Sequence, residues 1–578
     1  MFDALFTTTT EYKKLSHALS GKGACALFGL PASGRAQVYA ALCRQLDKPL
    51  CIVTPGEAEA TRFAADLNTL GIPAAVFPAR DYVLRPIEGT AREYEYRRLA
   101  ALGELVGGRL RAVAVPAEAL TQFTTPKEDF CANTRTLHAG DTLLRDDLLA
   151  ALFGAGYTRR AQVDGPGQFS VRGDIVDIFA PDQKMPVRME FWGDEIDTLH
   201  TFDLTTQRRE DAIDKFYLSP AREVLFGKPA DAAEQLRAFL AKQRGKKKTA
   251  MADCMAADLD LLDGGAVPVN MDKYLAVRYP HPATVLDYFD DPILVAEEPA
   301  SIREADRATA YRRGEELKSL ILDGVLCAGL DNLYADPSYL WSKTGHYRTI
   351  CAENFARSMP DQPLKDIINA PAHTLPAWNG EVAGLLEDLK PLCDAGYTVT
   401  LLAGTDRAAA GLARDLRDKG ILVTTDAAAA PAAGLVQVLA GHLSAGCEFP
   451  FAKYALLTGR AFGETSSQKK KRKKAKDALN SLTEITPGDL VVHQNHGIGR
   501  YAGIQRMAVQ GVTKDYLRIE YDKKDVLYVP VTQLDLLSRY TAPGDSENVK
   551  LSRLGGAEWT KTRKKVRAAT EQMAKELI

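Results

Sequence analysis

The sequence lacks a long hydrophobic run, a cysteine metal motif and a net charge of either sign, and each absence excludes a class of protein. It contains no run of about 18 apolar residues, so we expect no membrane-spanning helix. The N-terminal residues, Met1–Leu5, have no basic region before an apolar core, so we expect no signal peptide. A formal net charge of −2 gives no electrostatic reason to expect nucleic acid as the main partner of the whole chain.

The cysteines give no indication of a metal cofactor. The nine cysteines are scattered and odd in number, and none forms C-x-x-C, which indicates free thiols in a reducing cytoplasm and argues against a zinc site. We find no Ser/His/Asp or Cys/His arrangement with a recognisable spacing, so nothing indicates hydrolytic catalysis. We therefore expect a cytoplasmic monomer that holds no metal and no other cofactor in this chain.

The 578 residues are enough for about three to five domains. Alternating strand and helix patterns in residues 1–126 predict a parallel sheet with crossover helices. Short alternating runs in residues 127–217 predict an inserted antiparallel α+β domain, and residues 218–343 return to the mixed pattern of the first module. Residues 344–463 predict a further α/β domain, which we interpret as a structural spacer.

The remaining residues are a linker, a β-rich segment and a helical pattern. Residues 464–480 contain six consecutive cations, which repel one another and stay solvated, with weak nucleic-acid contact as the alternative. Short strands in residues 481–548 predict a small twisted barrel. Residues 549–578 lead into a helix with no Gly or Pro stop signal, so we expect that the chain was cut out of a longer protein.

The strongest local motif is a degenerate phosphate-binding loop. Gly29 and Gly34 keep the two glycines of G-x-x-x-x-G-K-[ST], between an apolar strand pattern and a helix pattern. Arg35 stands where the lysine belongs, and Ala36 stands where the Mg²⁺-binding hydroxyl belongs. The loop therefore cannot hold metal–nucleotide in the usual way, and a chance glycine turn is the alternative.

A second catalytic element is also missing from the strand pattern at residues 111–115. An apolar strand ending in Asp-Glu would hold Mg²⁺, but this pattern runs into Pro116-Ala117-Glu118. Loss of ATPase activity is the interpretation that we favour.

A candidate interface follows from strand alternation at residues 187–192. Val187, Met189 and Phe191 should point one way, and Arg188 and Trp192 the other. Arg and Trp are enriched at interface hot spots, so this face is either a binding patch or an ordinary surface.

Arg172 precedes Gly173, where a bulge could re-aim the arginine.

The β-rich C-terminal segment offers two further patterns. His493 and His496 lie three residues apart, but no neighbouring Cys or acidic cluster completes a metal site, so we assign them a role in stabilising a turn. Gly497, Gly499 and Gly503 predict tight turns and bulges.

Residues 501–509 mix polar and apolar side chains. They fit either an edge strand that accepts a partner's strand or an internal paired strand.

Three stretches together resemble a known family. Gly488–Tyr501 (GDLVVHQNHGIGRY) with Leu527–Val531 (LYVPV) resembles the RNA-polymerase-interaction domain of the CarD type. Phe169–Phe179 with Arg188–Asp197 resembles the homology module shared with the excinuclease component UvrB, and Leu551–Trp559 (LSRLGGAEW) is similar to the segment before the motor of bacterial transcription-repair coupling factors. This order of parts resembles the N-terminal portion of that family, without its motor and C-terminal domain.

The resemblance implies a fold and a function. The fold is a multidomain α/β protein: a degenerate P-loop-type parallel-sheet module with an inserted antiparallel domain, a further α/β domain, and a small Tudor-like β-barrel followed by a helix. The family binds RNA polymerase stalled at DNA damage, displaces it by ATP-dependent DNA translocation and recruits the excinuclease component UvrA. ATP and Mg²⁺ belong to the absent motor, and the N-terminal module is a catalytically dead relative of UvrB.

The resemblance also implies contact residues. Those for the excinuclease component UvrA match Arg172, Arg188 and Trp192, with Phe191 beside them; the family's aromatic is usually Phe, and Trp192 departs from it. The β subunit of RNA polymerase would pair with the strand that carries Ile504, Gln505, Arg506, Met507 and Val509.

Three functions stay open at this point. We favour an adaptor between RNA polymerase and nucleotide excision repair. The alternatives are an active P-loop NTPase and a CarD-like transcription regulator that acts through residues 481–545 alone.

Overall fold

The computed structural model describes residues 7–553, with gaps at residues 87–91, 356–361, 379–381, 431, 460–485, 494–495, 510–511, 523–524, 531–536 and 541–550. The basic linker predicted at 464–480 and most of the helical segment predicted at 549–578 lie outside these residues.

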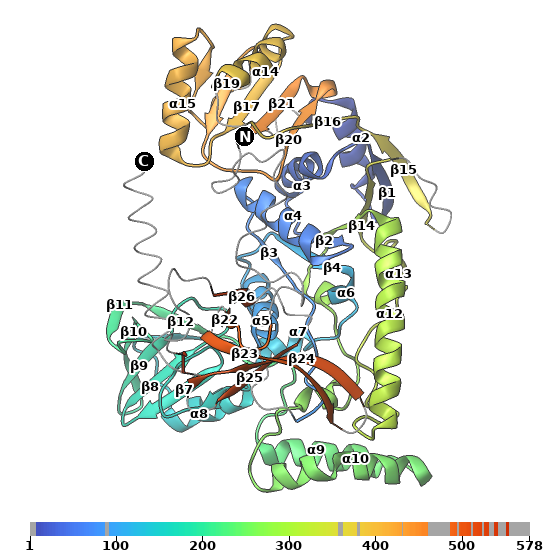
Figure 1. The fold of residues 1–578 in the computed structure, drawn as a ribbon, viewed down its shortest axis with the longest axis vertical. Coiled ribbons are helices and arrows are strands. Elements are labelled where there is room, and N and C mark those ends of the chain that lie inside the picture. The colour runs from blue at the N-terminus through green and yellow to red at the C-terminus, as the bar shows by residue number, and fades with distance from the viewer. Residues whose placement is uncertain are drawn as a thin grey trace.

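A seven-stranded parallel sheet forms the N-terminal module (Figure 1). Its order is β15-β1-β14-β13-β2-β4-β3, and every pairing in it is parallel. The strands are β1 Gly23–Phe28, β2 Leu50–Thr54, β3 Ala74–Val76, β4 Ala112–Pro116, β13 Ile293–Glu297, β14 Arg348–Glu353 and β15 Leu364–Asn369. β2 and β4 are buried along their whole length, as expected where helices cover both faces of a parallel sheet.

Strand alternation separates the apolar core into two layers. Cys25 and Leu27 of β1 belong to one buried cluster, whereas Ala24 and Phe28 belong to the other. The first layer is completed by α2 Thr10–Ala18, α3 Ala32–Leu46 and α4 Glu57–Thr69. The second is completed by α5 Glu93–Val106, α6 Ala117–Leu120, α7 Lys127–Ala132, α12 Pro299–Leu322 and α13 Tyr339–Lys343. β14 and β15 pair with β1, so this sheet continues past the module end predicted at residue 343.

The inserted domain is built on a six-stranded sheet with the order β11-β10-β9-β8-β7-β6. All its pairings are antiparallel except that of β6 with β7. The strands are β6 Thr158–Arg159, β7 Gln168–Arg172, β8 Ile175–Phe179, β9 Val187–Trp192, β10 Glu195–Phe202 and β11 Arg209–Ala212. One face packs on α8 Arg145–Gly154 through Leu148 and Leu152. The antiparallel pattern predicted for residues 127–217 is present.

A buried charge network lies where the chain leaves the inserted domain. β5 Arg135–His138 pairs with β12 Lys215–Leu218 at the entry and exit of the domain. Just beyond β12, the carboxylate of Glu223 contacts Arg98 of α5 at 2.6 Å and Arg80 at 3.2 Å. Arg80 also pairs with Asp272 at 2.7 Å. Because a buried charge needs compensation, this network fixes the junction between the inserted domain and the module.

The second part of the module adds helices α9 Pro229–Ala241, α10 Gly245–Asp263 and α11 Leu275–Arg278, with 3₁₀ turns η1 Met271–Tyr274 and η2 Val285–Tyr288. Helices α9 and α10 project from the end of the molecule opposite the second α/β domain (Figure 1).

The second α/β domain has a mixed six-stranded sheet, β16-β20-β21-β17-β19-β18. Its elements are β16 His373–Leu375, α14 Val382–Asp394, β17 Thr398–Leu402, α15 Asp406–Asp418, β18 Val423–Thr424, β19 Val436–Leu439, β20 Gly446–Phe449, the 3₁₀ turn η3 Pro450–Ala452 and β21 Tyr454–Thr458. The domain packs on the first module: Ser444 donates to Asp66 of α4 at 2.6 Å, and Thr69 donates to the carbonyl of His442 at 2.9 Å.

The C-terminal β domain is an antiparallel sheet with the order β25-β24-β23-β22-β26. The strands are β22 Leu490–His493, β23 Gly497–Val509, β24 Val512–Glu520, β25 Val526–Pro530 and β26 Leu537–Arg539. Leu517, Ile519 and Tyr521 share the buried core, as their alternation predicted. Within the described residues β25 and β26 stand at the two ends of this order, so closure into a Tudor-like barrel stays a prediction.

The glycines of this domain have the roles that the sequence indicated. Gly503 has φ +108° at the point where the β23–β24 register shifts, which is a bulge. A Cβ at Gly499 would lie 2.4 Å from Ile519 Cγ2, so the close approach of the two strands requires glycine there.

Among the described residues, none of the helices is both long enough and apolar enough to span a bilayer.

Candidate functional site

The second half of the phosphate-loop motif forms the first turn of helix α3. Gly29 keeps a positive φ of +87°, but α3 already begins at Ala32, so the second glycine of the motif lies inside the helix. A Cβ on Gly34 would lie 2.8 Å from the Sγ of Cys447, because the first turn of α3 packs on β20 of the second α/β domain. Protein therefore covers the helix N-terminus that would receive a phosphate group in a working loop.

Arg35 is the centre of a buried ion pair. Its guanidinium is almost fully buried and contacts Glu297 at 2.9 Å and Glu298 at 3.0 Å. Tyr39, one turn later in α3, donates to Glu297 at 2.5 Å. Burial alone would lower the pKa of Arg35, but the carboxylate of Glu297 holds it above the ordinary value. Arg35 therefore stays charged and satisfies an acidic residue of the module itself.

The 111–115 strand runs into Pro116-Ala117-Glu118 and supplies no Asp-Glu pair, as the sequence indicated, but a different buried strand does end in acidic residues. Glu297 closes the buried strand β13, and Glu298 follows it. The signal was visible as an apolar run, Ile293–Ala296, followed by two glutamates. The acidic element is present, but its charge is compensated by Arg35 instead of a metal ion.

On the inserted domain, one buried carboxylate joins the two candidate arginines. Asp177 of β8 receives Arg188 at 2.7 Å and Arg172 at 2.5 Å. Arg188 also donates to the carbonyl of Gln207 at 3.0 Å and lies 4.8 Å over the ring of Phe202. The structure therefore brings both predicted arginines together, and Asp177 is the residue that the sequence interpretation missed.

Strand alternation in β9 places the two candidate aromatics on opposite faces. Trp192 is 83% exposed at the end of β9, next to the turn at Gly193, which has φ +63°. Phe191 is 6% exposed and belongs to the core of the domain. Phe191 is therefore corrected from a direct contact to a packing residue. Gly173, with φ +61°, lies in the tight turn between β7 and β8, so a turn and not a bulge follows Arg172.

The strand predicted for the polymerase contact, β23, has strand neighbours on both edges in its first residues and on one edge in the rest. Residues 497–500 of β23 pair with β22, and residues 500–509 pair with β24. Among the described residues, the strand pairings leave the second edge of β23 beyond Tyr501 without a neighbouring strand. Ile504 is 44% exposed on this half, and Gln505 is partly buried. Arg506, Met507 and Val509 lie opposite Asp515, Lys514 and Val512 in the hairpin.

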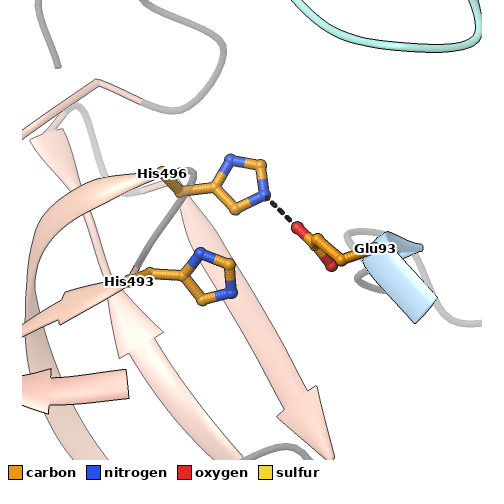
Figure 2. Close-up of side chains that lie close together, drawn as sticks. All are labelled: Glu93, His493 and His496. Carbon is orange, nitrogen blue, oxygen red and sulfur yellow. Dashed lines mark ion pairs between the residues drawn. The ribbon is translucent and has the colours of Figure 1, made fainter. Parts of the chain in front are cut away.

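His493 and His496 lie at the end of β22 and in the turn before β23, and they face Glu93, the first residue of α5 (Figure 2). The Nε2 atom of His496 is 3.4 Å from Glu93 Oε1. The sequence interpretation missed Glu93 because it is distant in the chain, and no local pattern marks it as a neighbour of the histidines.

Replacing Arg35 with alanine should destabilise the N-terminal module by about 3–5 kcal/mol near pH 7, since it leaves the Glu297 carboxyl buried without its cation. Burial raises the pKa of Glu297 and Arg35 opposes this rise, so the pKa is higher still in the variant. A carboxyl whose pKa is raised in the folded state loses stability as pH rises from the unfolded value, about 4.3, through the folded one. The deficit should therefore be smaller at pH 5 than at pH 7.5.

Urea unfolding of Arg35→Ala and wild type at both pH values measures this deficit. Arg44→Ala, at the exposed end of the same helix, is the control and should cost about 1 kcal/mol or less at both pH values. Equal deficits of Arg35→Ala at pH 5 and pH 7.5 would contradict the assignment of the Arg35–Glu297 pair.

Two segments of the chain match known domain families. Residues 136–224 match the UvrB interaction domain, and residues 485–541 match the CarD-like/TRCF RID domain. The first match contains Arg172, Arg188 and Trp192, and the second contains the β23–β24 hairpin.

Similarity to whole proteins extends along almost the entire chain. The chain is 28% identical over 567 residues to the transcription-repair-coupling factor of Bacillus subtilis, which covers 96% of the chain and 48% of that protein. The factors of Staphylococcus haemolyticus and Staphylococcus aureus (strain MRSA252) are 28% and 26% identical, covering 95% of the chain and 48% of each protein. The chain thus spans about half the length of these curated relatives. The resemblance noted in the sequence is confirmed: the chain is similar to about half of a transcription-repair-coupling factor, and its segments match the UvrB interaction domain and the CarD-like/TRCF RID domain.

Proposed function

We propose that this chain is an adaptor that links RNA polymerase stalled at DNA lesions to nucleotide excision repair, as the N-terminal part of a transcription-repair coupling factor. The observation that carries the proposal is the combination of the exposed Trp192 and Ile504, on two separate domains, with a nucleotide loop whose Arg35 is paired with Glu297. A docking scaffold needs pre-formed binding surfaces and does not need to hydrolyse ATP itself. ATP-dependent displacement of the polymerase along DNA belongs to the longer protein, through residues outside this chain.

The first surface, which we call the arginine–tryptophan face, consists of Arg172, Arg188 and Trp192. We propose the excinuclease component UvrA as its partner. Asp177 holds both guanidiniums in place before any partner arrives, so less side-chain entropy is lost on binding. The indole of Trp192 presents a large apolar area beside these charges, which is the composition of an interface hot spot.

The second surface is the open half of the β23–β24 hairpin, residues 502–509. We propose that the β subunit of RNA polymerase adds a strand to this edge. Backbone groups on an unpaired edge form a ready template for another strand, and neighbouring side chains such as Ile504 supply specificity.

The two alternative functions explain less of the molecule. An active NTPase would require Mg²⁺–nucleotide to displace the buried Arg35–Glu297 pair and the contact of α3 with β20. A CarD-like regulator acting through the C-terminal β domain alone leaves the arginine–tryptophan face without a role. The proposal includes a cytoplasmic location and a monomeric chain, and it assigns no nucleotide cofactor to the loop at residues 29–36.

Trp192→Ala should weaken binding of purified UvrA by about 10- to 30-fold, the effect expected of a hot-spot aromatic. The side chain is 83% exposed, so the fold should not change. Tyr311→Ala is the matched control, because Tyr311 of α12 is an aromatic 75% exposed at a different place, and its loss should leave the affinity unchanged. Isothermal titration calorimetry on the full chain measures both affinities.

Arg188→Glu, checked for folding by circular dichroism, extends this test to the charged part of the face. Affinities for UvrA that are equal in wild type, Trp192→Ala and a folded Arg188→Glu variant would place the docking site elsewhere.

Ile504→Glu should reduce binding of the RNA polymerase β subunit by about 10-fold or more, because a charge on an open strand edge opposes strand addition. Ile367→Glu is the control: Ile367 of β15 is 63% exposed on a different sheet. Retention of the chain on the immobilised polymerase β subunit measures the difference. If both variants are retained like the wild type, the hairpin is not the contact.

A further inference from the structure

Glu93, His493 and His496 come from segments far apart in the chain and meet between helix α5 and the C-terminal β domain (Figure 2). One ligand atom of each residue lies within 4.8 Å of those of the other two. We propose that these three side chains bind a divalent transition-metal ion of the zinc type, which ties the C-terminal β domain to the N-terminal module. This site goes beyond the adaptor function and does not depend on it.

The donor set selects the class of metal. Two imidazoles and one carboxylate form a ligand set that zinc uses where a fourth position is left to water. Imidazole nitrogens favour Zn²⁺ and its neighbours over Mg²⁺ and Ca²⁺, which prefer oxygen ligands alone. The predicted ion is therefore Zn²⁺ or a first-row ion of similar preference, such as Co²⁺.

One of the ligand–ligand distances already fits a tetrahedral metal ion. With metal–ligand bonds of about 2.0–2.1 Å, neighbouring ligands of a tetrahedron lie about 3.4 Å apart. The Nε2 atom of His496 and Oε1 of Glu93 are already 3.4 Å apart. The two imidazole centroids are 4.7 Å apart with their planes at 40°, so small rotations of the side chains bring the third donor into the same sphere.

The burial of the three donors differs across the site. His493 is buried, whereas the side chains of His496 and Glu93 are 28% and 14% exposed. The cluster is therefore enclosed on the side of His493 and accessible to solvent on the side of His496.

The backbone holds two of the ligands rigidly. His493 is the last residue of β22 and pairs with Gly497 of β23 and with Leu537 of β26. Glu93 begins α5, a helix packed into the module core through Leu99 and Leu102. A metal at this point therefore connects two well-packed elements and sets the orientation of the β23–β24 hairpin relative to the module.

The test uses the full chain without a polyhistidine tag, equilibrated with Zn²⁺ or, as a spectroscopic probe, Co²⁺. We expect one ion per chain by elemental analysis after dialysis, and visible absorption bands of tetrahedral Co²⁺. Glu93→Gln and His496→Ala, whose side chains are only partly buried, should each weaken binding by about 10-fold or more. His281→Ala removes an exposed histidine elsewhere and should leave the affinity unchanged.

The outcomes separate the site from its alternatives. Stoichiometric binding that Glu93→Gln and His496→Ala both weaken, with normal circular dichroism, supports the proposal. Binding that depends on the histidines and is unaffected by Glu93→Gln would overturn the link between the two domains. An absence of stoichiometric binding in the wild type would reduce the three side chains to a hydrogen-bonded ion pair and overturn the metal site.

Discussion

The buried pair of Arg35 and Glu297 is the interaction on which the account of this molecule depends. The guanidinium and the carboxylate are 2.9 Å apart and nearly inaccessible to water, and Arg35 stands at the motif position where a working loop has lysine. Such a pair adds little net stability, because the loss of hydration offsets most of the attraction, but either partner alone would be costly. The two side chains are therefore held against each other, and a metal-bound nucleotide at this loop would have to separate the ion pair.

The same physical device recurs at the arginine–tryptophan face. Asp177 is buried and neutralised by two arginines, of which Arg188 is mostly buried and Arg172 half-exposed. The inner charge fixes the outer ones, so the surface offered to a partner is pre-formed. The hairpin of the C-terminal β domain provides a different kind of surface, where backbone groups on an open edge supply affinity and neighbouring side chains supply specificity. Two surfaces with unrelated chemistry can bind two partners without competing for the same residues, which is what an adaptor requires.

Local pattern was enough to predict much of this fold. The alternating patterns of residues 1–126 and 344–463 correctly indicated α/β structure, because an apolar run such as β2 and a capped amphipathic helix such as α15 are both local signals. Alternation in Val187–Trp192 correctly separated Arg188 and Trp192 from Val187 and Met189. It also implied that Phe191 faces the core, although the family resemblance had suggested a contact there.

The rest depends on tertiary contacts that no local pattern carries. Arg35 contacts Glu297, and His496 contacts Glu93, only in the folded chain, because the two residues of each pair are far apart in the sequence. The half-open edge of β23 could not be predicted either, since it depends on where β22 ends and not on the residues of β23. Helix α3 begins at Ala32, and its first turn packs on β20 of the second α/β domain, a contact that no local pattern carries.

The most direct measurement of the adaptor claim is retention of UvrA on immobilised RNA polymerase, with and without this chain, in the absence of ATP. We expect UvrA to be retained only when the chain is present, because the proposed adaptor would hold the polymerase on one face and UvrA on the other. Failure to retain UvrA, under conditions where the chain itself stays on the polymerase, would contradict it.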